Sequence, residues 1–363
     1  PADGIRSWFR SDDTPAFSSP DEIQDVGPKP MTYSLLNAIL NGGLPPQYDF
    51  NGQFIGILLP RSWSAEAAVV MLQVMDSGGC ACPLDPALQT TAVEAAKDHM
   101  NLSAVIVCPD TPNLEAFQTT LNLIKVDRDP QQCGKVQWPL GISTVAVESK
   151  NRTTTPSASN EGQRVLSSSA DRPYLALRTS GTTGQPKTIL ISGRSLWYNA
   201  HAMAVSLRLT PSDRNLNVMP LFHIGGLTCS FFAVLVSGSS VIYCPSFDPA
   251  TFVKHLKSPE LGVTWAYGVP TIFRAVILQL HGQPLHNSKL RMVRSGAAKL
   301  MPADADELRT LLGCTVLSTY SMTECMPIAN RPWDEASIPP QLRDSVGYPV
   351  GPTIRICDDH GTV

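Results

Sequence analysis

Nine consecutive residues, 179–187, have a composition suited to holding an anion: their sequence is TSGTTGQPK. Two glycines let the backbone approach a phosphate, the hydroxyl side chains supply donors, and Lys187 supplies positive charge. A strand expected at 174–177 would feed a turn whose successive N–H groups form an anion nest. The segment is not a Walker A loop, which needs a glycine directly before the lysine, because Pro186 stands there. A plain surface turn explains the composition but not the order of these nine residues.

The loop resembles the signature loop of the adenylate-forming superfamily, which includes acyl-CoA and aryl-CoA ligases, luciferases and nonribosomal-peptide adenylation domains. Five further segments are similar to that superfamily in the same order, and the resemblance covers roughly residues 30–363. They are GG and PLDP at 78–79 and 83–86, PLFHIGG at 220–226, GAA at 296–298, YSMTE at 320–324 and GYPVG at 347–351.

The resemblance implies ATP-dependent activation of a carboxylic acid to an acyl-adenylate, with release of pyrophosphate and transfer to a thiol. It implies ATP and Mg²⁺ as cofactors, and coenzyme A or the phosphopantetheine of a carrier domain as acceptor. Such chemistry needs positioning and charge neutralisation more than covalent help from the protein.

The resemblance also assigns roles to single residues. The expected phosphate-holding residues of the loop are Thr179, Ser180, Gly181, Thr182, Thr183, Gly184 and Lys187. Glu324 would bind Mg²⁺, Thr323 would donate to the α-phosphate, and Tyr320 would stack on the adenine. The backbone turn of Gly296, Ala297 and Ala298 would lie along the adenine. The expected catalytic set is Lys187, Thr323, Glu324 and His223.

Several of these residues have plainer interpretations when taken alone. Glu324 on its own is one more surface acid, and His223 on its own is a structural histidine. Their neighbours in the YSMTE and PLFH segments favour the functional interpretation, with His223 as a gate at the acyl pocket. Met322 is equally well explained as packing or as pocket wall.

The position of Ile224 bears on which acid is activated. Amino-acid-activating domains carry an Asp at this point to pair with the α-ammonium, and an unpaired buried ammonium is costly. We therefore expect an acyl or aryl acid without an α-amino group. The expected pocket walls are His223, Ile224, Gly225, Tyr267, Gly268, Val269, Ser295, Thr319 and Met322.

Three positions depart from the family pattern. Thr188 stands where many members have glycine, a change that would affect loop mobility. Gly193 stands where many have histidine, and Ser321 replaces the usual glycine of the fifth segment.

The elements that must position these residues alternate between strands and helices, which predicts mostly parallel, doubly wound sheets. Strands are expected at 54–59, 81–84, 104–108, 174–177, 216–219, 241–244, 263–266, 292–294, 315–318 and 353–357, with a turn at 358–361. Helices are expected at 65–75, 91–100, 195–207, 271–280 and 303–312. The uncharged stretch 225–244 is expected to be a buried helix, a turn and a buried strand rather than a membrane span.

The fold class is α/β: the large N-terminal core of an adenylate-forming enzyme, with two mixed sheets flanked by helices and the start of a third, β subdomain. The expected units are an extended segment at 1–30, a first α/β subdomain at 31–147, a Ser/Thr-rich connection at 148–170, a second α/β subdomain with the ATP-binding motifs at 171–345, and the start of the β subdomain at 346–363. The family's small C-terminal domain, with its ribose-binding Asp, hinge and Lys, is not in this sequence. We therefore expect the chain to bind ATP but to adenylate poorly alone, and a larger parent protein with a carrier domain fits this.

Bulk composition excludes several other classes. The net charge of −3 gives no basic surface for nucleic acid. The nine cysteines are odd in number and mostly lie in apolar stretches, which indicates buried reduced thiols and a cytoplasmic location. Two rival functions remain beside the acyl or aryl adenylating core: an amino-acid-selecting adenylation domain and a non-catalytic nucleotide-binding module.

Overall fold

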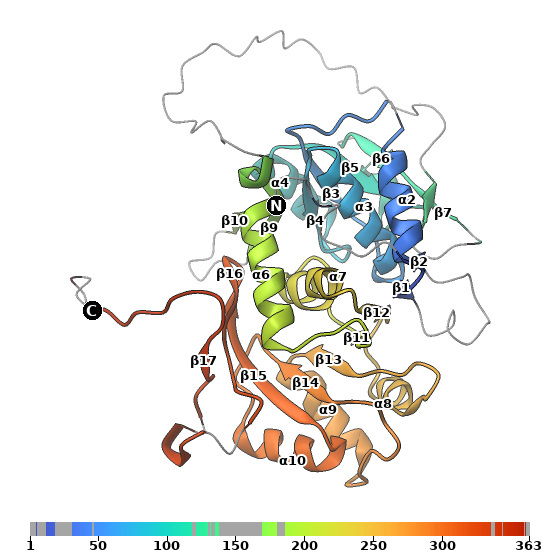
Figure 1. The fold of residues 1–363 in the computed structure, drawn as a ribbon. Helices are drawn as coiled ribbons and strands as arrows, with labels where there is room; N and C mark the ends of the chain where they lie inside the picture. The colour runs from blue at the N-terminus through green and yellow to red at the C-terminus, as the bar shows by residue number, and fades with distance from the viewer. Residues whose placement is uncertain are drawn as a thin grey trace.

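The computed structural model describes residues 5, 12–18, 31–45, 47–117, 121–129, 131, 135–137, 169–179, 186–334, 338–342, 344–358 and 360. Residues 180–185 of the expected phosphate loop, and nearly all of the expected connection at 148–170, lie outside this part. Figure 1 shows two sheets, one above the other, with helices between them and on the outer face of each.

The first sheet has six strands in the order β10-β9-β4-β3-β5-β6. Its strands are β3 (Phe54–Ile57), β4 (Cys80–Pro83), β5 (Leu102–Val107), β6 (Leu123–Lys125), β9 (Pro173–Thr179) and β10 (Lys187–Ser192). Its neighbours are parallel except β9 and β10, which form an antiparallel hairpin around the phosphate loop. A two-stranded ribbon, β7 (Asp127–Arg128) with β8 (Val136–Gln137), lies beside it.

The helices of the first half differ in how deeply they are buried. Helix α3 (Ser64–Asp76) is buried on every side over 65–75, because it packs in the core shared with the second sheet. Helix α4 (Thr90–Met100) instead buries one stripe in a separate apolar cluster. Helix α2 (Tyr33–Gly42), which begins at its capping residue Thr32, completes this half with the short α5 (Leu114–Phe117).

The second sheet has nine strands in the order β17-β16-β15-β14-β13-β11-β12-β1-β2. Its members are β1 (Pro15–Ser18), β2 (Met31–Thr32), β11 (Arg214–Asn217), β12 (Ser240–Tyr243), β13 (Trp265–Gly268), β14 (Met292–Ser295), β15 (Thr315–Met322), β16 (Cys325–Asn330) and β17 (Tyr348–Pro349). The six strands from β15 to β1 are parallel to one another, and antiparallel strands close both edges. The first strand in the sequence therefore belongs to the second sheet.

Helices cover both faces of the second sheet, as expected for a doubly wound fold. On the outer face, α8 (Pro249–Lys257), α9 (Pro270–Leu280) and α10 (Pro302–Leu312) bury their apolar sides in one cluster. On the inner face, α6 (Gly193–Ser206), the π-helix η4 (Gly225–Phe232) and α7 (Ala233–Ser237) pack in the core between the two sheets (Figure 1).

The uncharged stretch 225–244 has the expected organisation: η4 and α7 form one buried helical segment, a turn follows, and β12 is fully buried. A Cβ atom at Gly226 would collide with the carbonyl oxygen of Pro220, so this residue must be glycine for η4 to begin here. Among the described residues, no helix combines the length and apolarity that a membrane crossing requires. The eight cysteines at described positions are all free thiols.

A polar cluster fixes the amino ends of the parallel strands in the second sheet. Asp213, which precedes β11, accepts hydrogen bonds from Arg291 Nε (2.6 Å) and Nη2 (2.9 Å) and from Thr264 Oγ1 (2.8 Å). Thr264 precedes β13 and Arg291 precedes β14, so one carboxylate ties three strand starts together. The opposite, carboxyl ends of these strands are then held in register, and that is the edge where open α/β sheets bind their ligands.

One predicted element is wrong. Residues 353–357 form no strand; they are exposed, Ile356 is 88% accessible, and the segment runs outward from the sheet beyond β17 (Figure 1). A strand needs a partner to satisfy its backbone, and no described strand lies beside this one. The structure also contains α2, α8, β10 and β16, which were not predicted.

Candidate active site

The predicted site residues of the second half meet at the carboxyl edge of the nine-stranded sheet. Gly268 at the end of β13 pairs with Ser295 at the end of β14, which pairs with Ser318 in β15. Parallel strands that end together present the loops that follow them to one place. This arrangement brings the GAA and YSMTE segments next to each other.

Tyr267 is the centre of a closely packed wall at this edge. A Cβ atom on Gly225 would lie 2.7 Å from its hydroxyl oxygen, and one on Gly296 would lie 3.0 Å from the same atom and 2.9 Å from Thr319 Cγ2. Tyr267 therefore packs against both glycines, and Gly296 also packs against Thr319, so four residues predicted from separate segments are linked by close contacts. The glycines are required because the tyrosine ring occupies the space that a side chain would need.

The GAA segment leaves β14 at the buried Gly296 and becomes exposed at Ala297 and Ala298. Gly296 N–H donates to the carbonyl oxygen of Gly268 (3.2 Å), which anchors the turn to β13. Ala297 has φ of 67°, a left-handed conformation that residues with a side chain rarely adopt, and Ala297 and Ala298 are both exposed. Such a turn presents backbone groups to a flat ligand without covering them with side chains.

The YSMTE segment continues β15 beyond its predicted end at residue 318. Alternation along the strand places the side chains of Thr319 and Ser321 on the inner face of the sheet. Tyr320 and Met322 lie on the outer face and are 51% and 44% exposed. Thr319 and Met322, both predicted as pocket walls, are thus on opposite faces of β15.

Thr323 and Glu324 form the turn between β15 and β16. Glu324 is exposed and borders a cleft of about 750 Å³ between α6 and the start of β16. The cleft continues along residues 350–352 of the GYPVG region. Helix α6 follows β10 directly, so the cleft begins close to the strand that carries Lys187. Gly193, the first residue of α6, packs so closely on Tyr174 that a Cβ would lie 2.9 Å from its ring, which accounts for the absence of the family histidine.

The two ends of the expected phosphate loop face each other across the β9–β10 hairpin. Thr179 is the register partner of Lys187, which is exposed. Ser180, Gly181, Thr182, Thr183 and Gly184 lie outside the described residues. Within the described part of the chain no ion pair involves Lys187, so its ammonium is available for a ligand.

A second cavity, of about 280 Å³, joins the loop end to the PLFH segment. Thr179 and Pro186 line one side, His223 lines another, and Asp85 of the PLDP segment completes it. Partial burial lowers the pKa of His223, and the negative charge of Asp85 opposes that shift without cancelling it. The imidazole is therefore neutral at pH 7, where it can accept or donate a hydrogen bond without adding charge.

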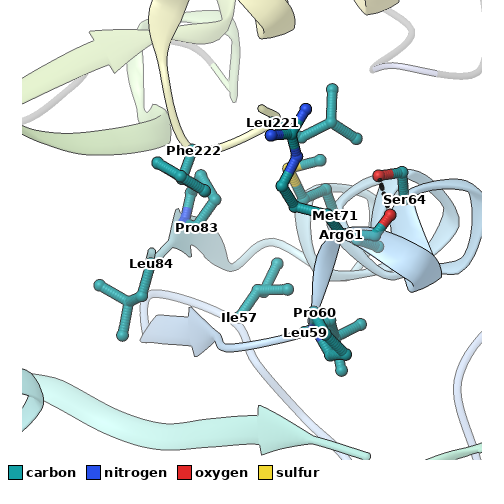
Figure 2. A pocket seen from close by; sticks show the side chains of 11 residues that line it. Ile57, Leu59, Pro60, Arg61, Ser64, Met71, Pro83, Leu84, Leu221 and Phe222 are labelled. Carbon is teal, nitrogen blue, oxygen red and sulfur yellow. Dashed lines mark hydrogen bonds between the residues drawn. The ribbon is translucent and has the colours of Figure 1, made fainter. Parts of the chain in front are cut away.

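The PLFH segment rests on the first half of the molecule through a small enclosed pocket (Figure 2). Phe222 lies above Pro83, whereas Leu221 lies beside Arg61, whose guanidinium donates a hydrogen bond to the carbonyl oxygen of Val218. The pocket measures about 20 Å³, room for one water molecule at most. The residues directly before His223 are thus packed against the first half with almost no space between them.

Sequence reasoning missed two charged residues at the site. Asp85 lies within the PLDP segment, but its motif alone assigns it no role. Arg294, the third residue of β14, is fully buried in the wall beside Tyr267 and Thr319. Its signal in the sequence was a lone charge inside an apolar strand, directly before the GAA segment.

The described residues fit a magnesium–nucleotide ligand. No group of three or more His, Cys, Asp or Glu side chains among them forms a ready-made metal cage. Magnesium commonly takes one or two carboxylates and completes its shell with phosphate oxygens and water, which the single exposed Glu324 suits. Exposed Lys187, Tyr320 and the open 296–298 turn offer a cation, an aromatic face and bare backbone.

Comparison with known proteins agrees with this geometry. A family model described as AMP-binding enzyme matches residues 50–363. Sulfoacetate–CoA ligase of Cupriavidus necator is 28% identical over 313 residues, 86% of this chain and 57% of that protein. Probable CoA ligase CCL9 of Humulus lupulus is 32% identical over 322 residues, again 86% of this chain and 57% of that protein.

Among solved structures, apo MatB from Rhodopseudomonas palustris superposes with a TM-score of 0.72 at 21% identity, covering 98% of this chain and 66% of that one. At this identity the likeness shows the fold, and it confirms the predicted α/β core. The chain spans about half the length of the curated relatives it matches. The family match over 50–363 confirms the resemblance read from the motifs: the chain belongs to the AMP-binding enzyme family.

Proposed function

We propose that the protein containing this chain activates a carboxylic acid with ATP and transfers the acyl group to a thiol. The observation that carries the proposal is the convergence of separate motifs at one sheet edge. Tyr267 packs against Gly225 and Gly296, Gly296 packs against Thr319, and the strand that holds Thr319 continues into the Glu324 turn. Exposed charges of both signs, on Lys187 and Glu324, border this edge.

In the proposed reaction a carboxylate oxygen attacks the α-phosphorus of ATP and pyrophosphate leaves, which gives an acyl-adenylate. Lys187 and the hydroxyl and N–H donors of the phosphate loop would neutralise charge that builds on the β- and γ-phosphates. Thr323 would hold the α-phosphate, while Tyr320 and the 296–298 turn would fix the adenine. Magnesium, bound through Glu324, would neutralise phosphate charge and orient the leaving group.

The acid is proposed to lack an α-amino group. Ile224 supplies no counter-charge, and the fixed charge buried in the described wall, that of Arg294, is positive. A positive wall repels an ammonium group, so the geometry speaks against an amino-acid-selecting domain. The presence of both Lys187 and Glu324 at exposed positions speaks against a non-catalytic module.

The acceptor is proposed to be the thiol of coenzyme A. The relatives named above are CoA ligases, and a carrier-domain phosphopantetheine arm ends in the same thiol chemistry. Nothing in the net charge of −3 suggests a nucleic-acid partner.

The test is pyrophosphate release by the natural full-length protein with ATP, Mg²⁺ and a panel of short, medium and long fatty acids, aryl acids, diacids and amino acids. Release with a non-amino acid supports the proposal and identifies the acid class. Release with amino acids alone would overturn the inference from Ile224 and the positive wall. A folded protein that releases pyrophosphate with no acid would instead favour the non-catalytic module.

A further inference from the structure

Arg294 is the least satisfied charged side chain in the described core. It is 0% exposed, and its Nη2 donates to Thr319 Oγ1 (2.7 Å) and, at 3.5 Å, to Ser321 Oγ. Its Nε and Nη1 are buried and have no hydrogen-bond partner among the described residues. A guanidinium stays protonated in proteins, so these are charged donors without acceptors.

The described side chains around Arg294 supply no negative charge. Its Cζ lies 5.0 Å from the ring centroid of Tyr267, and the thiol of Cys229 in η4 is a second neighbour. Burial raises the pKa of Cys229 to about 11 and also raises the pKa of Tyr267, in each case against the influence of Arg294. Both groups are therefore neutral at pH 7.

Two other arginines in the molecule are paired with buried carboxylates. Arg291, three residues earlier in the chain, pairs with Asp213, and Arg128 pairs with the buried Glu66. No ion pair of Arg294 occurs in the part of the chain that the structure describes. An unpaired buried charge is strongly unfavourable, so its persistence at the site calls for a partner that arrives with the ligand.

The position of Arg294 fits such a partner. It lies beside Tyr267 and Thr319, and two residues before Gly296, where the adenine-side turn begins. Residues two apart in extended backbone are separated by roughly 7 Å. An acid whose activated carboxylate lies near Gly296 therefore needs only a short chain to bring a second carboxylate to this part of the wall.

We propose that Arg294 binds a second carboxylate of the activated acid, which makes the substrates of this site short dicarboxylic acids. The inference rests on the proposed adenylating function and deepens it. Thr319 and Tyr267 act as positioning residues that hold the guanidinium, and its free N–H groups complete their hydrogen bonds on the substrate. A site built to bind such a group discriminates strongly against an analogue that lacks it.

The first experiment compares each diacid with its monoamide in pyrophosphate release by the natural full-length protein: malonate against malonamate, and succinate against succinamate. The monoamide keeps the shape and replaces the second charge. We expect kcat/KM for at least one diacid to exceed that of its monoamide about 100-fold, equivalent to about 2.7 kcal/mol. Equal values, or a preference for monoacids and monoamides, would overturn the assignment while leaving adenylation itself in place.

The second experiment replaces the arginine. Arg294→Gln should lower kcat/KM for the diacid about 100-fold and leave the monoamide within about threefold, so that discrimination disappears. Arg274→Gln removes the same charge from an exposed position on the neighbouring α9 and should change neither value. An equal loss for both members of a pair would show a structural role for Arg294 and contradict the proposal.

A binding titration by calorimetry tests the anion subsite without turnover. It decides the proposal if the Arg294→Gln protein does not fold or if the wild type releases no pyrophosphate. Wild-type protein with Mg²⁺ and an ATP analogue that cannot react at the α-phosphorus should bind malonate and should bind malonamate at least tenfold more weakly. Binding without pyrophosphate release would refute the proposed activity and retain the anion subsite. No preference for malonate would refute the subsite.

Discussion

Glu324 and Lys187 are both exposed, and neither has an ion pair among the described residues. A solvated charge contributes little to folding stability, so its removal should affect the ligand alone. A substitution at either residue should therefore change ligand binding without changing folding stability.

Glu324→Gln should lower acid-dependent pyrophosphate release about 100-fold or more and leave the unfolding temperature unchanged. The amide keeps the size of the side chain and removes the charge that a Mg²⁺ ligand needs. The measurement is steady-state release at saturating and limiting Mg²⁺, since a lost metal ligand should raise the Mg²⁺ requirement. Glu307→Gln, an exposed acid on α10, is the matched control and should behave as wild type. An unchanged rate in Glu324→Gln would remove this residue from the site.

At this scale the sequence is informative wherever chemistry depends on residue type and order. The order of residues in TSGTTGQPK and YSMTE is enough to predict Lys187 and Glu324 as site residues. Arg294 could not be found in this way, because a charge in the third position of a short strand reads as a solvated side chain. Its burial depends on β13 and β15 flanking β14, and those neighbours come from distant parts of the chain.

Among the elements, the three parallel strands β11, β13 and β14 depend on one carboxylate at their amino ends. Asp213 is 4% exposed. Its burial alone would raise the pKa, but hydrogen bonds from Arg291, Thr264 and Thr210 outweigh burial and hold the pKa below the ordinary value for an aspartate. The carboxylate therefore stabilises the folded state at neutral pH, and this contribution is lost as the pH falls from about 4 through the lowered pKa.

Asp213→Asn should reduce the free energy of unfolding by about 2–4 kcal/mol at pH 7, because it leaves Arg291 without its partner at a largely buried position. Chemical denaturation at pH 7 and at stepwise lower pH is the measurement, and the difference from wild type should shrink as the pH falls below about 4. Asp306→Asn breaks an exposed Asp–Arg pair on α10 and should cost less than about 1 kcal/mol. Equal effects of the two substitutions would show that the cluster does not hold the strands.

Helix and strand prediction succeeded where local signals were complete and failed for two different reasons. Helix α8 was missed although Asp248 caps it, Pro249 begins it and basic residues end it, so its signals were present. Strand β10 was missed because it does not follow the regular alternation of buried and exposed residues that marks a strand in a sequence. Its strand conformation comes from pairing with β9. The failed strand at 353–357 is the converse case, in which apolar alternation exists but no described strand pairs with it.

For the whole molecule, the two halves share one apolar core rather than meeting at a polar interface. Helix α3 from the first half and η4 from the second lie in the same buried cluster. The hydroxyl of Tyr33 donates to the carbonyl oxygen of Ser239 (2.6 Å), which fastens α2 to the turn before β12. We expect the described core to unfold in one cooperative transition.

Phe17→Ala tests whether the shared core unfolds in one transition, because Phe17 lies in β1, the strand that joins the start of the chain to the second sheet. The ring is 0% exposed and packs against Phe231 (5.8 Å) and Tyr243 (5.9 Å). Its loss should reduce the free energy of unfolding by about 3–5 kcal/mol in a single transition seen by tryptophan fluorescence and circular dichroism alike. Leu278→Ala, 70% exposed on α9, should stay within about 0.5 kcal/mol. Two separate transitions in wild type would contradict a shared core.

The pairing of β1 with β12 could not be predicted from the sequence. Phe17 lies beside Val241, and nothing near either residue specifies the other. Residues 1–30 show only an extended character in the sequence, and the strand becomes evident when the buried edge of β12 is seen to need a partner. The alternation of strands and helices along the sequence predicted the α/β class, whereas the long-range strand order came from the fold.

The most direct test of acyl-adenylate formation follows an oxygen atom. The natural full-length protein is supplied with ATP, Mg²⁺, coenzyme A and its preferred acid labelled with ¹⁸O in the carboxylate. Attack at the α-phosphorus followed by thiol transfer breaks the acyl carbon–oxygen bond, so the AMP formed should carry one ¹⁸O by mass spectrometry. Label in inorganic phosphate together with ADP, or AMP without label, would contradict the account.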